Sequence, residues 1–483
     1  MSISGSLSNA FSGLTAAARG AEVVSQNLAN VMTDCYGRRE LMLSTRHLGG
    51  TGGGVRIDGI ARNIDTAVLG ERRLADATGA RTQSLASYFT RIEAAVGAPG
   101  EPGSLGTRIA EFESALVAAA SRPDTAPRLE AVLDAARALA GTFGTITDAI
   151  QKERMDADAA IATEVGRLNA ALGRISELNH NIRVEQASGR DPSGLLDERQ
   201  RLVDTVSAIV PVREVAREGG QIALFTTGGA VLVDGLAAEV GFTPTASITA
   251  DMTLGSGALS GLTLRGLPAT AGATSGMLGG GSLGALMSIR DELAPAAQSR
   301  LDAVARDLME RYEAADPTLA TGAAGLFTDR GAAFSATDEA GVAGRLLVNA
   351  AVDPERGGAL WRLRDGIGAA APGPVGQAAG LQGLAEALTL PRTPASGGFA
   401  GGARTVQGLA GEFLSGIGTA RQRAEGDLAY ATTRRDSLKA AELATGVDSD
   451  QELQQLLMIE KAYAANARVV AAAEAMLDRL MEI

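Results

Sequence analysis

The sequence has one cysteine, Cys35, and only two histidines, His47 and His180. One cysteine excludes an intramolecular disulfide, and three such side chains are too few for a typical zinc or iron–sulfur site. We therefore expect no metal centre, no cofactor and no oxidative folding step. Cys35 is interpreted as a free thiol or a small buried residue.

Aromatic residues are also scarce, at 3% of the chain, whereas glycine accounts for 61 of 483 residues. With 45% hydrophobic residues, the cores must be built from Ala, Leu, Val and Ile, which suits closely packed helices. The net charge is −12 and Lys and Arg do not cluster, so nucleic acid is not expected as a partner. The sequence has neither a long apolar run nor the basic and apolar start of a signal peptide. No membrane partner is expected, and any export uses a route without a cleaved leader.

What the sequence does have is a heptad pattern at each end. Near the start, apolar residues alternate at intervals of four and three, which predicts a long helix with a coiled-coil seam. The positions are Ile3, Leu7, Ala10, Leu14, Ala17, Ala21, Val24, Leu28 and Val31.

The last part of the chain repeats this spacing. Its positions are Leu456, Ile459, Tyr463, Asn466, Val470, Ala473, Leu477 and Leu480. Asn466 either fixes the helix register as a buried amide or faces solvent, and the sequence leaves both readings open. Ser449 with Glu452 predicts a capping box at the start of this helix, and Gly446 is expected to end the preceding one.

The two terminal helices are expected to pair as a coiled coil. Burying one Leu contributes only about 1.5–3 kcal/mol, and several seam positions are Ala. We therefore expect the pair to be marginal alone, mobile in the monomer, and ordered when many copies pack together.

The interior predicts helices with a β-rich insert. A long helix covers residues 148–185, with Asn179 interrupting its heptads, and further helices cover about 195–209, 284–315 and 405–444. Residues 209–283 contain short Val, Ile and Leu runs separated by "EGG" and "TGG", which predict hairpins. Residues 316–400 are mixed, with short strands around "GRLLVNAAVD" and a helix around "GQAAGLQGLAEAL".

Two glycine-rich stretches match enzyme motifs weakly. "GGGSLG" at 279–284 fits both a dinucleotide fingerprint and a nucleophile elbow at Ser282, but it lacks a preceding strand. A flexible β-to-helix joint is the preferred interpretation. "GGTGGGV" at 49–55 lacks the ending of a phosphate-binding loop and is interpreted as a flexible link between the first helix and a strand. We expect no catalytic residue.

The stretch "SGLTAAARGAEVVSQNLANVMTDCYGRRE" resembles the N-terminal signature of flagellar axial proteins, in which a heptad helix leads to an Asn-rich turn and then to Thr-Pro-Gly-Tyr and Arg. The matching positions are Asn27, Asn30, Thr33, Tyr36 and Arg38. Asp34 and Cys35 replace the Pro and Gly of the family.

Four further stretches favour one family of axial proteins, the hook-filament junction proteins. "GGGVRIDGIARNIDTAVLGERRLA" resembles the family's strand that leads through Arg62 and Asp65 into a long helix. "LLDERQRLVD" resembles its central Leu-Leu-Asp-x-Arg motif, and "GGSLGALMSIRDE" its re-entry into the rod. "GVDSDQELQQLLMIEKAYAANARVV" resembles the C-terminal axial signature, including Tyr463 and Asn466.

This resemblance to the hook-associated protein 1 family implies a structural subunit, mainly α with a β-rich insert. Residues 1–45 with 447–483 would form a terminal coiled-coil domain, 46–208 with 284–446 a helical rod domain, and 209–283 an outer β domain. The chain would be an extracellular flagellar protein, exported by the flagellar type III apparatus. Its implied partners are other copies of itself in a helical ring or tube, the hook protein, the second junction protein, and an export chaperone that holds the C-terminal helix.

Other readings remain open. A hook or distal rod protein shares the terminal signatures but should have mostly strands in its middle, and flagellin has comparable helices without the central motifs. A hydrolase that uses Ser282 is the alternative from another class of function.

Overall fold

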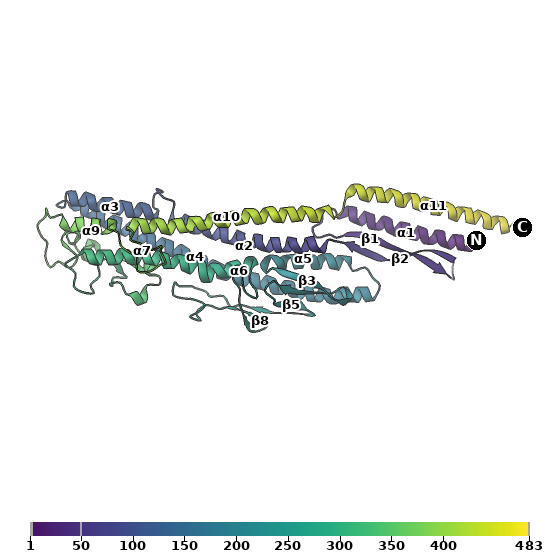
Figure 1. Ribbon diagram of the computed structural model, residues 1–483, viewed down its shortest axis with the longest axis horizontal. Helices are drawn as coiled ribbons and strands as arrows, with labels where there is room; N and C mark the ends of the chain where they lie inside the picture. Colours follow the sequence, from purple (N-terminus) through teal and green to yellow (C-terminus); the bar gives the residue numbers. More distant parts are fainter. Residues whose placement is uncertain (1–2, 49–50, 482–483) are drawn as a thin grey trace. The chain divides into compact units, whose positions relative to one another are not determined.

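The chain is described here by a computed structural model that places residues 3–48 and 51–481 (Figure 1). Most of these residues are helical, and their strands form four small antiparallel sheets. The prediction of a mainly α chain with limited β structure is confirmed. Across these two ranges, no helix combines the length and the apolar character that crossing a membrane requires.

The chain divides into two compact units, each built from segments that are far apart in the sequence. Unit 1 comprises Met1–Gly79, Gly166–Glu239 and Tyr430–Ile483, and unit 2 comprises Ala80–Val165 and Val240–Ala429. One of the four boundaries lies between Glu239 and Val240, and the other three fall within long helices, so these helices contribute residues to both units. They are α2 (Thr66–Val96), α4 (Ala126–Ala187) and α10 (Val406–Ala444).

Unit 1 contains both ends of the chain. Helix α1 (Ile3–Ala29) packs against α11 (Ser449–Met481) and against a hairpin of β1 (Arg38–Leu48) and β2 (Thr51–Asn63). The predicted flexible link at 49–55 was wrong for residues 51–55, which belong to β2, because they pair with β1. Residues 49 and 50 lie outside the described residues.

The start of α11 also differs from the prediction. The carboxylate of Asp448 accepts hydrogen bonds from the backbone N–H groups of Asp450 and Gln451, at 2.9 and 3.2 Å. Asp448 therefore caps the helix, and Ser449 is its first residue. The predicted capping box was wrong because Glu452 turns away from the helix end and binds elsewhere in unit 1.

The rest of unit 1 consists of α5 (Ser193–Ile209) and a four-stranded sheet in the order β3-β4-β5-β6. Two of its turns contain the predicted "EGG" and "TGG" stretches. The strands are β3 (Val212–Ala216), β4 (Ile222–Thr226), β5 (Val231–Asp234) and β6 (Leu236–Ala237).

Asn179 interrupts the heptads of α4 because its side chain holds the sheet to the helix. Its Nδ2 donates to the carbonyl of Ile222 at 2.8 Å, and its Oδ1 accepts from the N–H of Ile222 at 3.2 Å. Arg199 donates to the same Oδ1 at 2.9 Å and to the carbonyl of Gly220 at 2.7 Å. Burial lowers the pKa of Arg199 to about 10. A polar group at this seam position therefore completes the sheet edge.

Unit 2 holds the large apolar core. Its helices surround an aromatic group of Phe112, Tyr312 and Phe327, whose ring centroids lie 5.3–5.8 Å apart. Besides its parts of the three long helices, the unit contains α3 (Leu105–Ser121), α6 (Gly281–Ser288), a π-helical turn (Ile289–Leu293), α7 (Ala294–Ala315), α8 (Arg362–Asp365) and α9 (Ala379–Thr389).

The strands of unit 2 are short. The segment that was predicted as one β-rich insert, 209–283, contributes the sheet of unit 1 and a second, three-stranded sheet here. The predicted strand and helix within 316–400 correspond to β11 and α9. The strands are β7 (Val240–Gly241), β8 (Leu262–Leu264), β9 (Leu267–Ala269), β10 (Phe327–Asp329) and β11 (Leu346–Val348).

The "GGGSLG" stretch forms the start of α6, where the backbone is crowded. A Cβ on Gly279 would lie 2.0 Å from the carbonyl oxygen of Ser275, and one on Gly284 would lie 2.3 Å from that of Gly272. Close packing accounts for these glycines. The joint is therefore tightly packed, whereas the sequence suggested flexibility.

Candidate assembly site

The signature residues of the N-terminus meet α11 in one polar network within unit 1. Asn27 is fully buried, and its side-chain amide makes all four of the hydrogen bonds that it can make. Its Oδ1 accepts from the N–H of Arg39 and the hydroxyl of Tyr36, both at 2.9 Å. Its Nδ2 donates to the carbonyl of Arg39 at 2.8 Å and to the carboxylate of Glu452 at 3.1 Å. Asn27 thus connects α1, the start of β1 and α11.

Glu452 is the acidic centre of this network and has no exposed surface. Arg38 donates from Nε to its Oε1 at 2.7 Å and from Nη2 to Gln455 at 3.3 Å. A buried carboxylate needs such partners, because an unpaired one is strongly destabilising. The first turn of α11 is therefore fixed to the beginning of β1.

Asp197 forms a second acidic centre, which ties the same turn to α5. It accepts from the N–H of Gly37 at 3.2 Å, from Arg62 at 2.8 Å and from Arg39 at 3.2 Å. Arg39 also lies 4.9 Å from the centroid of the Tyr36 ring, and burial raises the pKa of this tyrosine. The Leu-Leu-Asp-x-Arg motif thus supplies Asp197 to the N-terminal turn and Arg199 to the sheet.

Cys35 lies in this turn with a left-handed backbone, at φ 63°. Glycine is the residue best suited to that conformation, and glycine is what the axial signature has at this position. Its thiol is half-buried and lies 3.5 Å from Asp204, and burial together with this carboxylate raises the pKa of the thiol to about 12. The turn therefore keeps the backbone conformation suited to the signature although its residues differ.

Asn30 plays a local part. Its Nδ2 donates to the carbonyl of Gln26 at 2.9 Å, and its Oδ1 accepts from the hydroxyl of Thr33 at 3.2 Å. These contacts end α1. Of the four signature residues predicted from the sequence, Asn27, Tyr36 and Arg38 share one network, and Asn30 shapes the turn before it.

The predicted seam residues lie on both terminal helices with different exposure. On α1, Val24 is buried, and Ile3, Leu7, Leu14 and Leu28 are half-buried. The prediction was wrong for Val31, which is exposed in the turn after α1, because the helix ends at Ala29. On α11, Ile459, Asn466 and Val470 are half-buried. The other predicted positions of α11 are exposed: Leu456, Tyr463, Leu477 and Leu480.

The face of α1 that actually meets α11 consists of small residues. Gly13 lies against Asn466 and Gly20 against Ile459, at positions where a Cβ would be 2.7 and 3.1 Å from those side chains. Sequence reasoning missed these glycines because it counted only large or apolar residues. Their spacing of seven, the same as the heptad, was the available signal.

Unit 2 contains a second polar cluster that the sequence did not reveal. Arg290 is fully buried and pairs with Asp158 at 2.6 Å and with Asp291 at 2.8 Å. Arg154, equally buried, donates to the carbonyls of Thr249 at 2.9 Å and Arg290 at 3.1 Å. Its pKa is lowered by burial. These side chains fix the loop that precedes β8 to α4.

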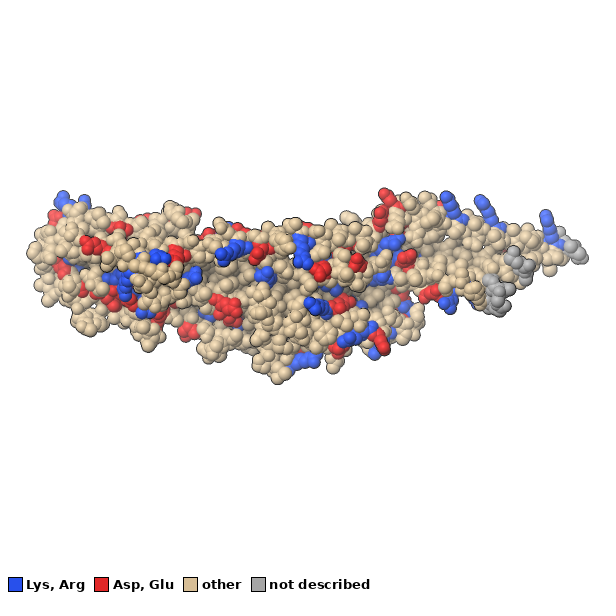
Figure 2. All heavy atoms as spheres, viewed as in Figure 1, with Lys and Arg blue, Asp and Glu red and all other residues tan. Residues whose placement is uncertain are grey.

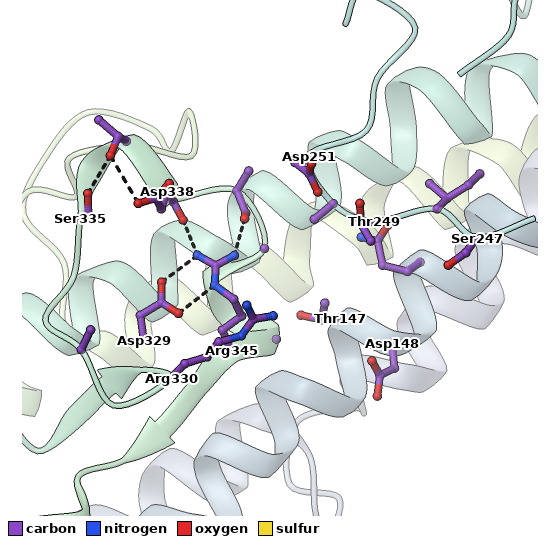
Figure 3. Close-up of a pocket in the computed structure, with 18 of the residues that line it drawn as sticks. Thr147, Asp148, Ser247, Thr249, Asp251, Asp329, Arg330, Ser335, Asp338 and Arg345 are labelled. Atoms are coloured by element: carbon purple, nitrogen blue, oxygen red, sulfur yellow. Dashed lines mark hydrogen bonds and ion pairs between the residues drawn. The ribbon is translucent and has the colours of Figure 1, made fainter. Parts of the chain in front are cut away.

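That loop forms one wall of an open hollow of about 1060 Å³ (Figure 3). On the opposite wall, Arg345 makes two bonds of 2.8 Å to Asp329 and one of 2.7 Å to the carbonyl of Ala340. The guanidinium is thus committed to structural contacts. Within residues 3–48 and 51–481, no three His, Cys, Asp or Glu side chains are placed to hold a metal ion.

The comparisons with known proteins agree with these motifs. Residues 89–318 match the model of the flagellar hook-associated protein FlgK helical domain, and residues 443–483 match that of the flagellar basal body rod FlgEFG protein C-terminal region. Flagellar hook-associated protein 1 of Escherichia coli K12 is 25% identical over 240 residues, which cover 48% of this chain and 44% of that protein.

Two weaker similarities were also found. Flagellar hook-associated protein 1 of Bacillus subtilis 168 is 23% identical over 222 residues, covering 44% of each chain. The hook junction protein FlgK from Burkholderia pseudomallei aligns with a TM-score of 0.42 and 21% identity, over 54% of this chain and 46% of that one. The chain spans less than half the length of the curated relatives it matches. The resemblance predicted from the motifs is confirmed as a similarity: residues 89–318 are similar to the FlgK helical domain, and residues 443–483 to the C-terminal region of the basal body rod proteins.

Proposed function

We propose that the chain is a structural subunit of the bacterial flagellum at the junction between hook and filament. The match of residues 89–318 to the FlgK helical domain favours this role over a hook, rod or filament subunit, and the match of 443–483 supports a place in the flagellar axis. The subunit would be an extracellular part of the flagellum, exported by the flagellar type III apparatus. No observation favours the alternative of a hydrolase at Ser282.

The observation that carries the proposal is the exposed apolar surface of α11. Within the described part of this helix only Glu452 and Ala473 are buried, whereas large apolar side chains face solvent. Leu457 is 57%, Met458 65% and Leu480 59% exposed. Exposed apolar surface of this extent on one helix marks an interaction surface. Figure 2 shows that the visible surface over this end of unit 1 is mostly uncharged.

The proposed assembly uses both terminal helices. Residues 1–45 with 447–483 would form a coiled-coil domain whose copies pack into a ring or tube, with 46–208 and 284–446 as the rod domain and 209–283 as the outer domain. The predicted interface residues of α1 and α11 would line this contact. The hook protein, the second junction protein and an export chaperone on α11 complete the proposed partners.

The experiment compares cells that carry Met458→Asp with cells that carry Gln454→Asp, an exposed polar position on the same helix. A carboxylate at Met458 should block subunit packing because it would be buried without a partner, while the soluble monomer stays folded. Electron microscopy should show hooks without filaments for Met458→Asp and for a deletion of 450–483. Intact filaments on the deletion strain would contradict the proposal.

A further inference from the structure

Three residues of α1 meet three residues of α11 at heptad intervals. Gly13 lies against Asn466, Gly20 against Ile459, and Asn27 donates to Glu452 at 3.1 Å. From one pair to the next, the residue number on α1 rises by seven and the residue number on α11 falls by seven. The two helices are therefore antiparallel in a single register, in which the numbers of facing residues add up to 479 (Figure 1).

The apolar part of this contact does not select that register. Besides Gly20 and Asn27, the residues buried on α1 are small or medium-sized and apolar: Ala10, Ala16, Ala17, Val23 and Val24. These small residues repeat every seven positions, so a slip of one heptad would place small side chains in the same positions. Contacts of this kind are as good after the slip as before it.

The polar residues distinguish the registers. A slip of one heptad would move Glu452 away from Arg38 and Asn27, and place it either opposite Gly20 or beyond the end of α1. The carboxylate has no exposed surface in the observed register. In the slipped register it would either stay buried without partners or reach solvent only if α11 separated from α1. Asn27 would lose the same bond.

We propose that Glu452, through Asn27 and Arg38, selects the register of the terminal helices. The register decides which apolar side chains of α1 and α11 face outward together. Its importance for assembly rests on the function proposed above.

The test measures the register directly in the full-length monomer. Cys35→Ser removes the native thiol, and nitroxide labels are attached at Ala18→Cys and Ala471→Cys, both exposed positions. In the observed register Ala471 lies level with residue 8, so the labels are offset along the axis. A slip of one heptad changes this offset by about 10 Å. Electron–electron dipolar spectroscopy should give one narrow distance for the parent chain.

The variant Glu452→Ala should add a second distance, displaced by the amount that a slip of one heptad requires. Glu452→Gln keeps acceptor and bonding capacity and should retain the single distance, as should the exposed control Glu460→Ala. One unchanged distance in Glu452→Ala would overturn the proposal, and so would separation of the helices, which would show that Glu452 holds the pair without choosing its register.

This measurement does not depend on assembly. A parent chain with one register that forms no junction would refute the proposed function and leave the register assignment intact. Normal junctions from a variant with mixed registers would refute only the importance of the register for assembly.

Discussion

At the scale of single residues, the turn after α1 has the backbone conformation suited to the axial signature although two of its side chains differ. Cys35 adopts φ 63°, and Arg265 and Arg330 are the other described non-glycine residues with positive φ. The left-handed conformation costs an L-residue about 1–2 kcal/mol. The neighbours of Cys35 hold the turn in place, because Arg62 donates to its carbonyl at 3.2 Å and Gly37 donates to Asp197.

We expect Cys35→Gly to leave the free energy of unfolding unchanged or to raise it by up to about 1 kcal/mol, because glycine adopts this conformation without strain. Cys35→Val should lower it by at least about 1–2 kcal/mol, because a β-branched residue is least suited to positive φ. Denaturant unfolding of the two variants measures the difference. Equal stabilities would contradict the conformational explanation.

The same residue predicts a pH dependence. In the folded chain burial and Asp204 raise the pKa of Cys35 to about 12, above the ordinary pKa of a cysteine thiol, so the unfolded chain loses the thiol proton first. The unfolded state then binds fewer protons, and stability falls as pH rises from about 9 towards 12. We expect the denaturation midpoint of the parent chain to fall more steeply over this range than that of Cys35→Ser. Parallel curves would show that the thiol does not contribute.

At the scale of elements, single polar or glycine residues decide how helices meet their neighbours. Asn179 joins α4 to β4, and the glycines of α6 allow it to approach the preceding loop. Both interrupt an otherwise regular pattern in the sequence. In each case the interruption marks a contact with a distant segment.

Asn179→Leu should lower the free energy of unfolding by about 2–4 kcal/mol, because the buried guanidinium of Arg199 and the backbone of Ile222 would lose their partner. Asn181→Leu changes an exposed asparagine of the same helix and should stay within about 0.5 kcal/mol of the parent chain. Denaturant unfolding compares the two. A similar loss in both variants would mean that helix propensity, not the sheet contact, accounts for the effect.

Gly284→Ala should destabilise unit 2, because its Cβ would lie 2.3 Å from the carbonyl oxygen of Gly272. We expect a loss of at least about 2 kcal/mol from the forced backbone shift. Gly144→Ala is the matched control within α4, where the space around a Cβ is open. It should stabilise by about 0.5–1 kcal/mol through helix propensity, and thermal unfolding would separate the opposite signs.

At the scale of the whole molecule, burial is distributed unevenly between the terminal helices and the core. The large apolar cluster belongs to unit 2, whereas the described residues of α11 include only two buried side chains. Local stability follows buried apolar contact. The hypothesis of a marginal terminal pair therefore stays a prediction, and the exposure of α11 supports it.

Amide hydrogen exchange on the monomer should show weaker protection for α11 than for α3 and α7, which contribute to the core. Protection of α11 should rise when subunits assemble, because the exposed apolar side chains are then covered. Strong protection of residues 3–31 and of α11 in the isolated monomer would contradict a marginal pair.

The sequence by itself determined the terminal helices, several interior helices and the similarity to flagellar hook-associated proteins, because helix periodicity and short motifs are local properties. It did not reveal α3 or the first part of α4, residues 126–147. It also placed Asn27, Tyr36 and Arg38 in one signature. Only the tertiary structure decided that Glu452 binds Asn27 and Arg38, that Asp197 receives the N-terminal turn, and that glycines form the face of α1 toward α11. These contacts join residues that are hundreds of positions apart, and the spacing within one segment carries no information about what a buried polar group in another segment will meet.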